Sequence, residues 1–354
     1  MKTARGILLH AGMSAAYLAL GLRSLKIETA PLAFVFFVFA ALCALTLPFA
    51  LRRKPSRLYV AVSNVLILAL ILPVIASLAL YESFFFRHFD TPAEVVQSIE
   101  DYPGLIEEPH AFSSDRGLRL EGALYQAEAC EAKALAVLAH GYGVGHRGYL
   151  SVVDALARSG YLVFAYDATG YDASAGRSAW GLPQATNDLD AAIRFAERLP
   201  ESRDLPVVLF GHSLGGYAVG CATGLHPEVC AAVSLAGFSD SLDIIRAQGR
   251  RLVGSAIDVL LPYLSLYESI KFGAAASRTG VEGFGSSAAR VLIAHSADDA
   301  TVPIEFGLDR YRQAFEGDAR FTFLRLDRRG HENLFTNADA RIYISFLDEA
   351  VDGR

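Results

Sequence analysis

A serine held between two glycines follows directly on an apolar run near the middle of this 354-residue chain. In "PVVLFGHSLGGYAVG", residues 206–220, Ser213 lies between Gly211 and Gly215, after a strand-like run and before a helix-like one. A strand–turn–helix of this kind holds a serine on a sharp turn, with its hydroxyl exposed above the sheet. The glycines leave room where backbone segments pass closely. The stretch therefore predicts an α/β sheet with Ser213 at the carboxyl end of one strand.

The rest of the chain from residue 91 onward repeats the alternation of apolar runs and amphipathic segments. Near-continuous apolar runs separated by helical periodicity indicate a parallel sheet that is covered by helices on both faces. These runs lie at 133–139, 161–166, 206–211, 230–236 and 289–296, with a further strand at 319–327 and a last helix at 337–351. The alternating segment 118–128 predicts an antiparallel strand at the start of the sheet. We expect residues 91–354 to form one doubly wound α/β domain.

Two further residue types complete a possible site around Ser213. A serine hydroxyl is a weak nucleophile without a base, and the base needs an acid that orients it. Asp298 and Asp299 end one apolar strand, and His331 follows another. Both positions fall at the carboxyl edge of the sheet, in the order serine, aspartate, histidine that this architecture requires. We therefore take Ser213 and His331, with one of the two aspartates, as candidate catalytic residues.

When a serine attacks a carbonyl carbon, negative charge develops on the carbonyl oxygen. Two backbone N–H donors are needed to stabilise this oxyanion. Leu214, directly after the serine, is expected to supply one. Tyr142, in the loop after the strand at 133–139, is expected to supply the other. His140 is expected to brace this loop, and His212 to point away from the chemistry. His146 has two readings, the mouth of the site or solvent.

These motifs resemble those of the α/β-hydrolase superfamily, and most closely the group of monoacylglycerol lipases, lysophospholipases and S33 aminopeptidase-like proteins. The segment 140–176 is similar to the HGxGxH…D…G-x-x-x-S-x-G pattern of that group, and "FGHSLGG" and "HSADDATVP" to its serine and acid loops. The resemblance covers roughly residues 105–350. It implies a mostly parallel eight-stranded sheet, and it implies Asp299 as the acid, because Asp299 has the D-x-x-V-P spacing.

The sequence departs from this pattern in two places. The usual G-H-G reads Gly170-Tyr171-Asp172, and a usual glycine before the acid loop is Ser296. Residues 241–289 occupy the customary place of a cap. The apolar segment 250–270 is expected to be a lid helix, with a helix packed on its own domain as the alternative.

The first ninety residues have a different composition from the rest. The runs 30–51 and 58–80 are apolar, carry no charge and are each long enough to span a bilayer as a helix. The shorter run 7–22 is expected to be a third span, with a signal peptide or an interfacial helix as alternatives. The four positive charges at 52–57 place that loop in the cytoplasm. The hydrolase-like domain is then expected on the extracytoplasmic side of the cell membrane.

The aromatic stretch 81–89, "YESFFFRHF", has two readings: a belt at the membrane interface, or packing on the following domain. Charge is divided unevenly between the two regions. Residues 1–90 carry nine Lys and Arg against three Asp and Glu, so the remaining residues carry a net charge of −12. A domain that acidic is a poor nucleic-acid binder. Cys130, Cys221 and Cys230 are expected to be free thiols, with a disulfide between two of them as the alternative.

Together these features predict a membrane-anchored serine hydrolase that cleaves carboxylic esters through an acyl-enzyme. The expected substrates are small-molecule esters, and lipid-like ones of the monoacylglycerol or lysophospholipid type in particular. No metal or organic cofactor is implied. One alternative is a peptidase, which needs a cap carboxylate such as Asp243, Asp258 or Glu268 to hold an α-amino group. The other is a non-catalytic membrane-bound binding module.

Overall fold

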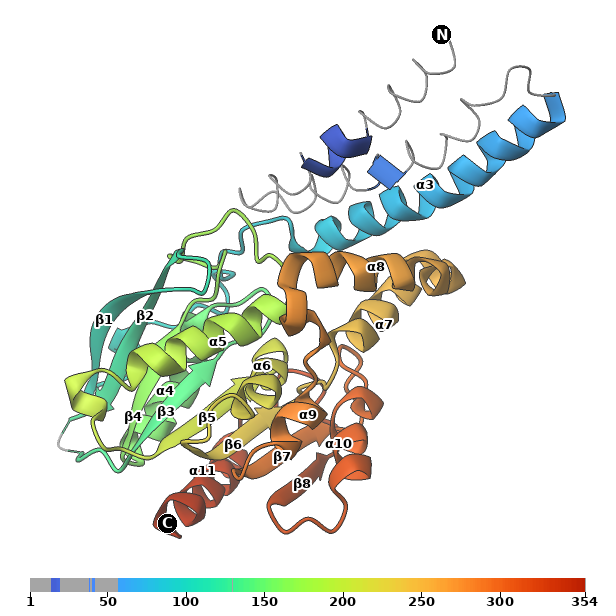
Figure 1. Cartoon of the computed structure of the whole chain (residues 1–354). Coiled ribbons are helices and arrows are strands. Elements are labelled where there is room, and N and C mark those ends of the chain that lie inside the picture. The colour runs from blue at the N-terminus through green and yellow to red at the C-terminus, as the bar shows by residue number, and fades with distance from the viewer. Residues whose placement is uncertain (1–13, 20–37, 39, 42–56, 129, 354) are drawn as a thin grey trace. The chain divides into compact units, whose positions relative to one another are not determined.

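The computed structural model describes residues 14–19, 38, 40, 41, 57–128 and 130–353 (Figure 1). By their internal contacts, the residues fall into two compact units. Unit 1 consists of residues 1–84 and 246–276, and unit 2 consists of residues 85–245 and 277–354.

Unit 2 is built on one eight-stranded sheet with the order β1-β2-β4-β3-β5-β6-β7-β8 (Figure 1). The strands are β1 (Leu105–Ser113), β2 (Arg119–Ala127), β3 (Ala134–Ala139), β4 (Tyr161–Tyr166), β5 (Val207–His212), β6 (Val229–Leu235), β7 (Arg290–Ser296) and β8 (Phe321–Leu326). β1 and β2 form an antiparallel hairpin, β2 joins β4 antiparallel, and all pairs from β4 to β8 are parallel. The prediction of a mostly parallel eight-stranded sheet is confirmed.

The central strands are buried along their whole length, as their continuous apolar sequences indicated. β3, β4 and β5 have every residue buried. β1 is different, because its sequence "LIEEPHAFS" mixes charged and apolar residues and half of it faces solvent. This mixed sequence is typical of an edge strand and gives no continuous apolar signal.

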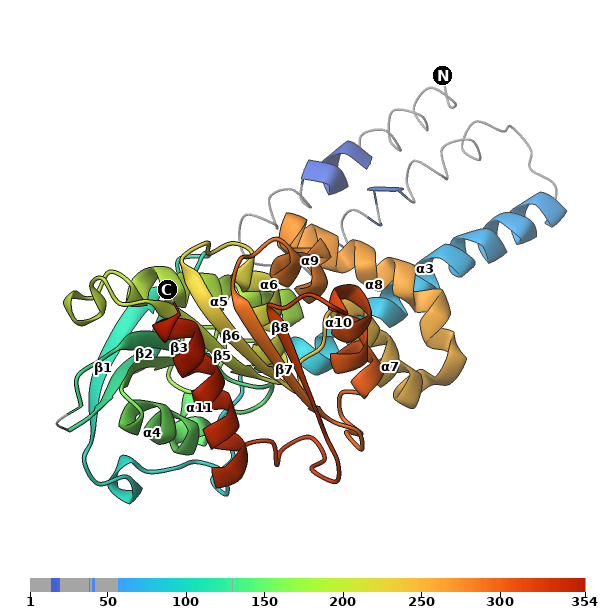
Figure 2. The same cartoon turned by 90° about the horizontal axis from the view of Figure 1, so that it is seen from below.

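Helices cover both faces of the sheet in unit 2 (Figures 1 and 2). The helices of this unit are α4 (Leu150–Arg158), α5 (Leu182–Ala196), α6 (Leu214–Thr223), the first part of α7 (Ser241–Val253), α9 (Gly280–Gly285), α10 (Leu308–Phe315) and α11 (Asn337–Asp352). One core cluster joins the sheet to α5, α6, α9 and α10. The other joins it to α4 and α11, seen together on one side in Figure 2. This is the arrangement of a doubly wound α/β domain.

In unit 1 the long helix α3 (Arg57–Phe85) contacts α8 (Ile257–Phe272) through polar groups near its end. The Tyr81 hydroxyl donates to the buried Glu268 carboxylate at 3.0 Å. The Lys271 ammonium, whose side chain is 1% exposed, lies 3.2 Å from the Glu82 carboxylate. Buried charges of this kind are retained only when they are paired. The segment expected to be a lid helix therefore packs on a helix from the N-terminal region.

The three predicted membrane spans lie in different parts of this description. Residues 7–22 lie outside the described residues except for 14–19, and 30–51 except for 38, 40 and 41, whereas 58–80 forms most of α3. Within the described part of the chain, no helix combines the length and the apolar run that a membrane crossing requires.

The aromatic stretch 81–89 begins in the last part of α3 and continues, from Phe85 onward, in unit 2. Phe85 and Phe89 are buried, and both rings make edge-on contacts with Tyr142. Phe89 also stacks on Tyr171. Phe86, by contrast, is 62% exposed. Two phenylalanines of this stretch therefore pack on the domain that follows. This was the second of the two interpretations of the stretch, the first being a belt at the membrane interface.

Candidate active site

The turn between β5 and α6 holds Ser213 in a strained backbone conformation. Its φ is 56° and its ψ is −116°, a combination that L-residues rarely adopt. The turn is tight because a Cβ on Gly211 would lie 2.3 Å from the Gly215 carbonyl oxygen, and one on Gly215 would lie 2.0 Å from the Ala139 carbonyl oxygen. Only glycine fits at these two positions. The local sequence therefore forces the serine into a sharp turn at the carboxyl end of β5.

A chain of hydrogen bonds runs from this serine to a buried carboxylate. The Ser213 Oγ lies 2.8 Å from His331 Nε2, and His331 Nδ1 lies 2.7 Å from Asp299 Oδ2. Ser213 follows β5, Asp299 follows β7 and His331 follows β8, so the carboxyl ends of three parallel strands supply the three groups. The structure thus brings together all three residues that the sequence singled out. It is the arrangement in which an imidazole can accept the hydroxyl proton while a carboxylate orients it.

Asp299 is ionised because its hydrogen bonds outweigh its burial. Burial alone would raise the pKa of this carboxyl, but hydrogen bonds from His295 and His331 hold the pKa well below its usual value. The backbone N–H groups of Thr301 and Val302 also donate to Asp299 Oδ1, at 2.8 and 2.9 Å. A buried carboxylate that stays ionised near neutral pH can stabilise an imidazolium at His331.

The neighbouring Asp298 has a different role from Asp299. Its side chain is exposed, and its Oδ1 accepts the Gly330 N–H at 3.1 Å and the Ser296 hydroxyl. The Ser296 oxygen in turn accepts the Arg329 N–H at 3.1 Å. Ser296, at a position where the resembling group has glycine, therefore joins Asp298 in holding the loop that carries His331.

The two positions expected to supply oxyanion donors, Leu214 and Tyr142, border one cavity. Leu214 is the first residue of α6, so its N–H points out of the helix end and has no acceptor within the helix. Tyr142 lies in the loop after β3, and the N–H groups on either side of it, from Gly141 and Gly143, donate to the hydroxyls of Tyr149 and Tyr171. Leu214 and Tyr142 line the same small cavity, whose free volume of about 10 Å³ is no more than one water needs.

The histidines near this loop are all engaged. His140 Nε2 accepts the Ala168 N–H at 2.9 Å, and its Nδ1 therefore donates to the Gly141 carbonyl at 2.8 Å. His140 thus braces the loop, as expected. His146 is buried and bonded to Asp167 at 2.8 Å, so it lies neither at a mouth nor in solvent.

Sequence reasoning missed His295, which is fully buried in β7. Its Nε2 lies 2.9 Å from the Val302 carbonyl oxygen and 3.2 Å from Asp299 Oδ2. A Cβ on Gly307 would lie 2.6 Å from the other ring nitrogen of His295. The signal that was available is the histidine four residues before Asp299 in an otherwise apolar strand.

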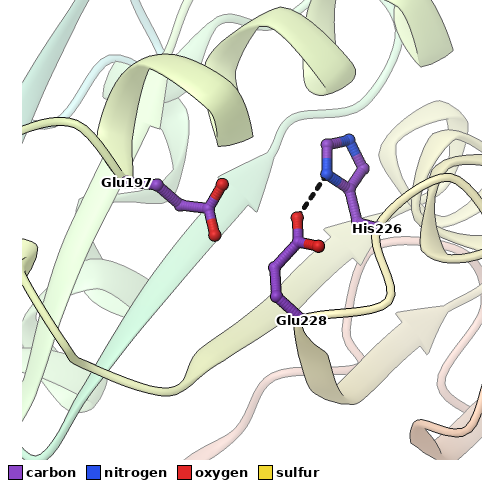
Figure 3. Close-up of side chains that lie close together, drawn as sticks. All are labelled: Glu197, His226 and Glu228. Atoms are coloured by element: carbon purple, nitrogen blue, oxygen red, sulfur yellow. Dashed lines mark hydrogen bonds and ion pairs between the residues drawn. The ribbon is translucent and has the colours of Figure 1, made fainter.

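Among the described residues, Glu197, His226 and Glu228 have the proximity of metal ligands (Figure 3). Both nitrogens of His226 are already occupied: Nδ1 contacts Glu228 at 2.6 Å and Nε2 contacts Asp190 at 2.9 Å. Burial lowers the pKa of His226, but the hydrogen bonds to Asp190 and Glu228 outweigh burial and raise it. A protonated imidazole has no lone pair for a metal. We therefore interpret this group as an ion-pair cluster.

Comparisons with known proteins agree with this fold. The family profile described as "Serine aminopeptidase, S33" matches residues 130–281, which include Ser213. An uncharacterized protein of Caenorhabditis elegans is 32% identical over 105 residues, 28% of this chain, and the match spans only 21% of that protein's own length.

Among solved structures, an esterase of Pyrococcus furiosus is similar with a TM-score of 0.57 and 14% identity, over 76% of this chain and 98% of its own. A 2,6-dihydroxy-pseudo-oxynicotine hydrolase is similar with a TM-score of 0.54 and 16% identity, over 99% of this chain and 90% of its own. At such identities the likeness concerns the fold. The chain therefore has the α/β-hydrolase fold, matches the S33 profile around Ser213, and holds a serine, a histidine and an aspartate in one hydrogen-bonded array.

Proposed function

We propose that this protein hydrolyses carboxylic esters, with Ser213 as nucleophile, His331 as general base and Asp299 as the acid that orients His331. The observation that carries the proposal is the continuous path of hydrogen bonds from Ser213 to Asp299, at 2.8 and 2.7 Å. His331 takes the serine proton as Oγ attacks the ester carbonyl, and the N–H groups of Tyr142 and Leu214 stabilise the oxyanion. His331 then protonates the leaving alcohol and activates water against the acyl-enzyme.

The proposed substrates are lipid-like esters, and the proposed location is a membrane with the hydrolase domain on its extracytoplasmic side. The support for both is the sequence: the uncharged apolar runs of the N-terminal region, the positive cluster at 52–57 and the resemblance to monoacylglycerol lipases and lysophospholipases. A hydrolase attached to a bilayer has its highest local concentration of substrate among esters that partition into that bilayer.

A peptidase of the same fold is the second candidate, favoured by the description of the matching family. It needs a free carboxylate in the cap region for the substrate's amino group. Asp243 is paired with Arg310 at 2.6 Å, and Asp258 with Arg246 at 2.7 Å. Glu268 is buried and accepts from Tyr81. Because all three carboxylates are engaged, we favour the esterase.

Covalent labelling with a fluorophosphonate probe tests the proposed nucleophile and base. Membranes that contain the wild-type protein should be labelled, whereas Ser213→Ala and His331→Ala should not, because the probe reacts only with an activated serine. Turnover of p-nitrophenyl acetate should fall in both variants by several orders of magnitude. A folded wild-type chain that neither labels nor turns over would overturn the proposal.

Substrate comparison tests the lipid assignment separately. Wild-type protein should have a higher kcat/KM for monoacylglycerols and lysophospholipids than for short water-soluble esters. Equal values for the two classes would refute a lipid substrate while leaving the esterase intact. Release of N-terminal residues from peptides, without ester turnover, would favour the peptidase.

A further inference from the structure

Three hydrogen bonds connect the loop that carries one oxyanion donor to the loop that carries the base. The Gly141 N–H donates to the Tyr149 hydroxyl at 3.0 Å, and that hydroxyl lies 2.9 Å from His212 Nδ1. His212 Nε2 in turn lies 2.9 Å from the carbonyl oxygen of His331. His212 directly precedes Ser213, and this relay was not expected from the sequence.

The chemistry of the partners fixes the direction of every bond in the relay. The His331 carbonyl can only accept, so His212 Nε2 must carry a proton. Burial, and then the nearby His331, lower the pKa of His212, so its ring is neutral and Nδ1 is an acceptor. Tyr149 therefore donates its hydroxyl proton to Nδ1 and accepts from Gly141. No group in the relay is left without a partner.

Tyr149 and His212 are held by these bonds as well as by packing, since His212 is buried and Tyr149 packs against the core. Both side chains border a cavity of about 240 Å³, so neighbouring atoms do not enclose them fully. At the Gly141 end of the relay the Tyr149 hydroxyl is packed closely against the backbone, since a Cβ on Gly141 would lie 2.7 Å from the Tyr149 hydroxyl oxygen. Side chains beside a cavity hold one position when hydrogen bonds fix them.

We propose that Tyr149 and His212 are positioning residues for the reaction, which set the distance between the base and the oxyanion donors. Gly141 is the residue before Tyr142, and His331 contributes both the carbonyl that receives the relay and the imidazole that contacts Ser213. A shift of Gly141 moves the oxyanion donor at Tyr142 relative to the His331 imidazole, and a shift of the His331 backbone moves the imidazole relative to that donor. The proposal rests on the proposed esterase function, because it assigns the relay to that same site.

The first test removes one oxygen atom from the relay. Tyr149→Phe should lower kcat for p-nitrophenyl acetate by about 10-fold or more per serine titrated with the fluorophosphonate, with KM within about 2-fold, because misplaced groups slow the chemical step. Tyr161→Phe is the matched control. Tyr161 is buried in β4, and its hydroxyl likewise makes a hydrogen bond, to Asp348 at 2.6 Å, remote from the site. An unchanged kcat in Tyr149→Phe would overturn the proposal.

A second pair of variants keeps the test decisive if Tyr149→Phe folds poorly. In His212→Gln an amide N–H reaches the position of Nε2 and can still donate to the His331 carbonyl, whereas the shorter side chain of His212→Asn cannot. We expect His212→Gln to retain at least about 10-fold more kcat per titrated serine than His212→Asn. Equal kcat values in the two variants would refute a role for the bond between His212 and the His331 carbonyl in the reaction. Failure of the wild-type protein itself to label or turn over would instead refute the proposed function.

Discussion

At the scale of single residues, the structure separates two adjacent aspartates that the sequence left as alternatives. Asp299 contacts His331 through its carboxylate, while Asp298 accepts the Gly330 N–H and remains exposed. The D-x-x-V-P spacing implied Asp299. The structure gives the physical reason, because the N–H groups of Thr301 and Val302 turn the Asp299 side chain inward.

Replacement of each aspartate by asparagine should therefore have very different effects. Asp299→Asn should lower kcat for p-nitrophenyl acetate by about 10³–10⁴-fold, because the amide no longer stabilises the imidazolium or the correct tautomer of His331. Asp298→Asn is the matched control and should stay within about 10-fold, since an amide oxygen can still accept the Gly330 N–H. A loss in Asp298→Asn as large as that in Asp299→Asn would contradict the assignment.

At the scale of elements, α5 is attached to the end of β4 through a buried carboxylate. Asp188 accepts hydrogen bonds from the Thr169 N–H at 2.8 Å, the Thr169 hydroxyl at 3.0 Å and the Gln184 amide at 2.8 Å. Burial raises the pKa of Asp188 to about 6, and these hydrogen bonds only partly offset burial. The folded protein therefore keeps a proton on Asp188 at pH values where the unfolded chain has already released it.

This difference predicts how stability depends on pH. Below the unfolded pKa the proton is bound in both states, so the contribution of Asp188 is most favourable there. As pH rises from ~4 to ~7, the free energy of unfolding should lose about 3 kcal/mol from this group. Urea unfolding of the wild type and Asp188→Asn across this range measures the effect as a changing difference between the two proteins. A constant difference at every pH would contradict the prediction.

The turn between β5 and α6 is an element that the local sequence predicted correctly. Gly211 and Gly215 were read as points of close backbone approach, and the structure has both in contact with backbone atoms. The parallel strands could also be predicted from the sequence, because strands that are buried on both faces need continuous apolar sequences. β1 could not be predicted in this way, because its charged and apolar residues form no continuous apolar run.

At the scale of the whole molecule, the protein combines an acidic α/β-hydrolase domain with a basic N-terminal region. If that region anchors the chain as proposed, the full-length protein should remain in the membrane pellet after extraction with alkaline carbonate. Spans in the bilayer resist this treatment, because removing them exposes apolar surface to water. Release into the supernatant would contradict membrane insertion, and a peripheral membrane protein serves as the control.

The sequence by itself determined the class of fold and the candidate residues around Ser213, because apolar periodicity, glycine turns and the order of motifs are local properties of a chain. The tertiary structure decided what each side chain touches. His331 meets Ser213 across 118 positions of sequence, and His212, expected to point away from the chemistry, donates to the His331 backbone across 119. Phe85 and Phe89 pack on Tyr142 for the same reason. Such contacts join residues that are far apart in the sequence. They depend on strand register and loop geometry, which no local sequence pattern encodes.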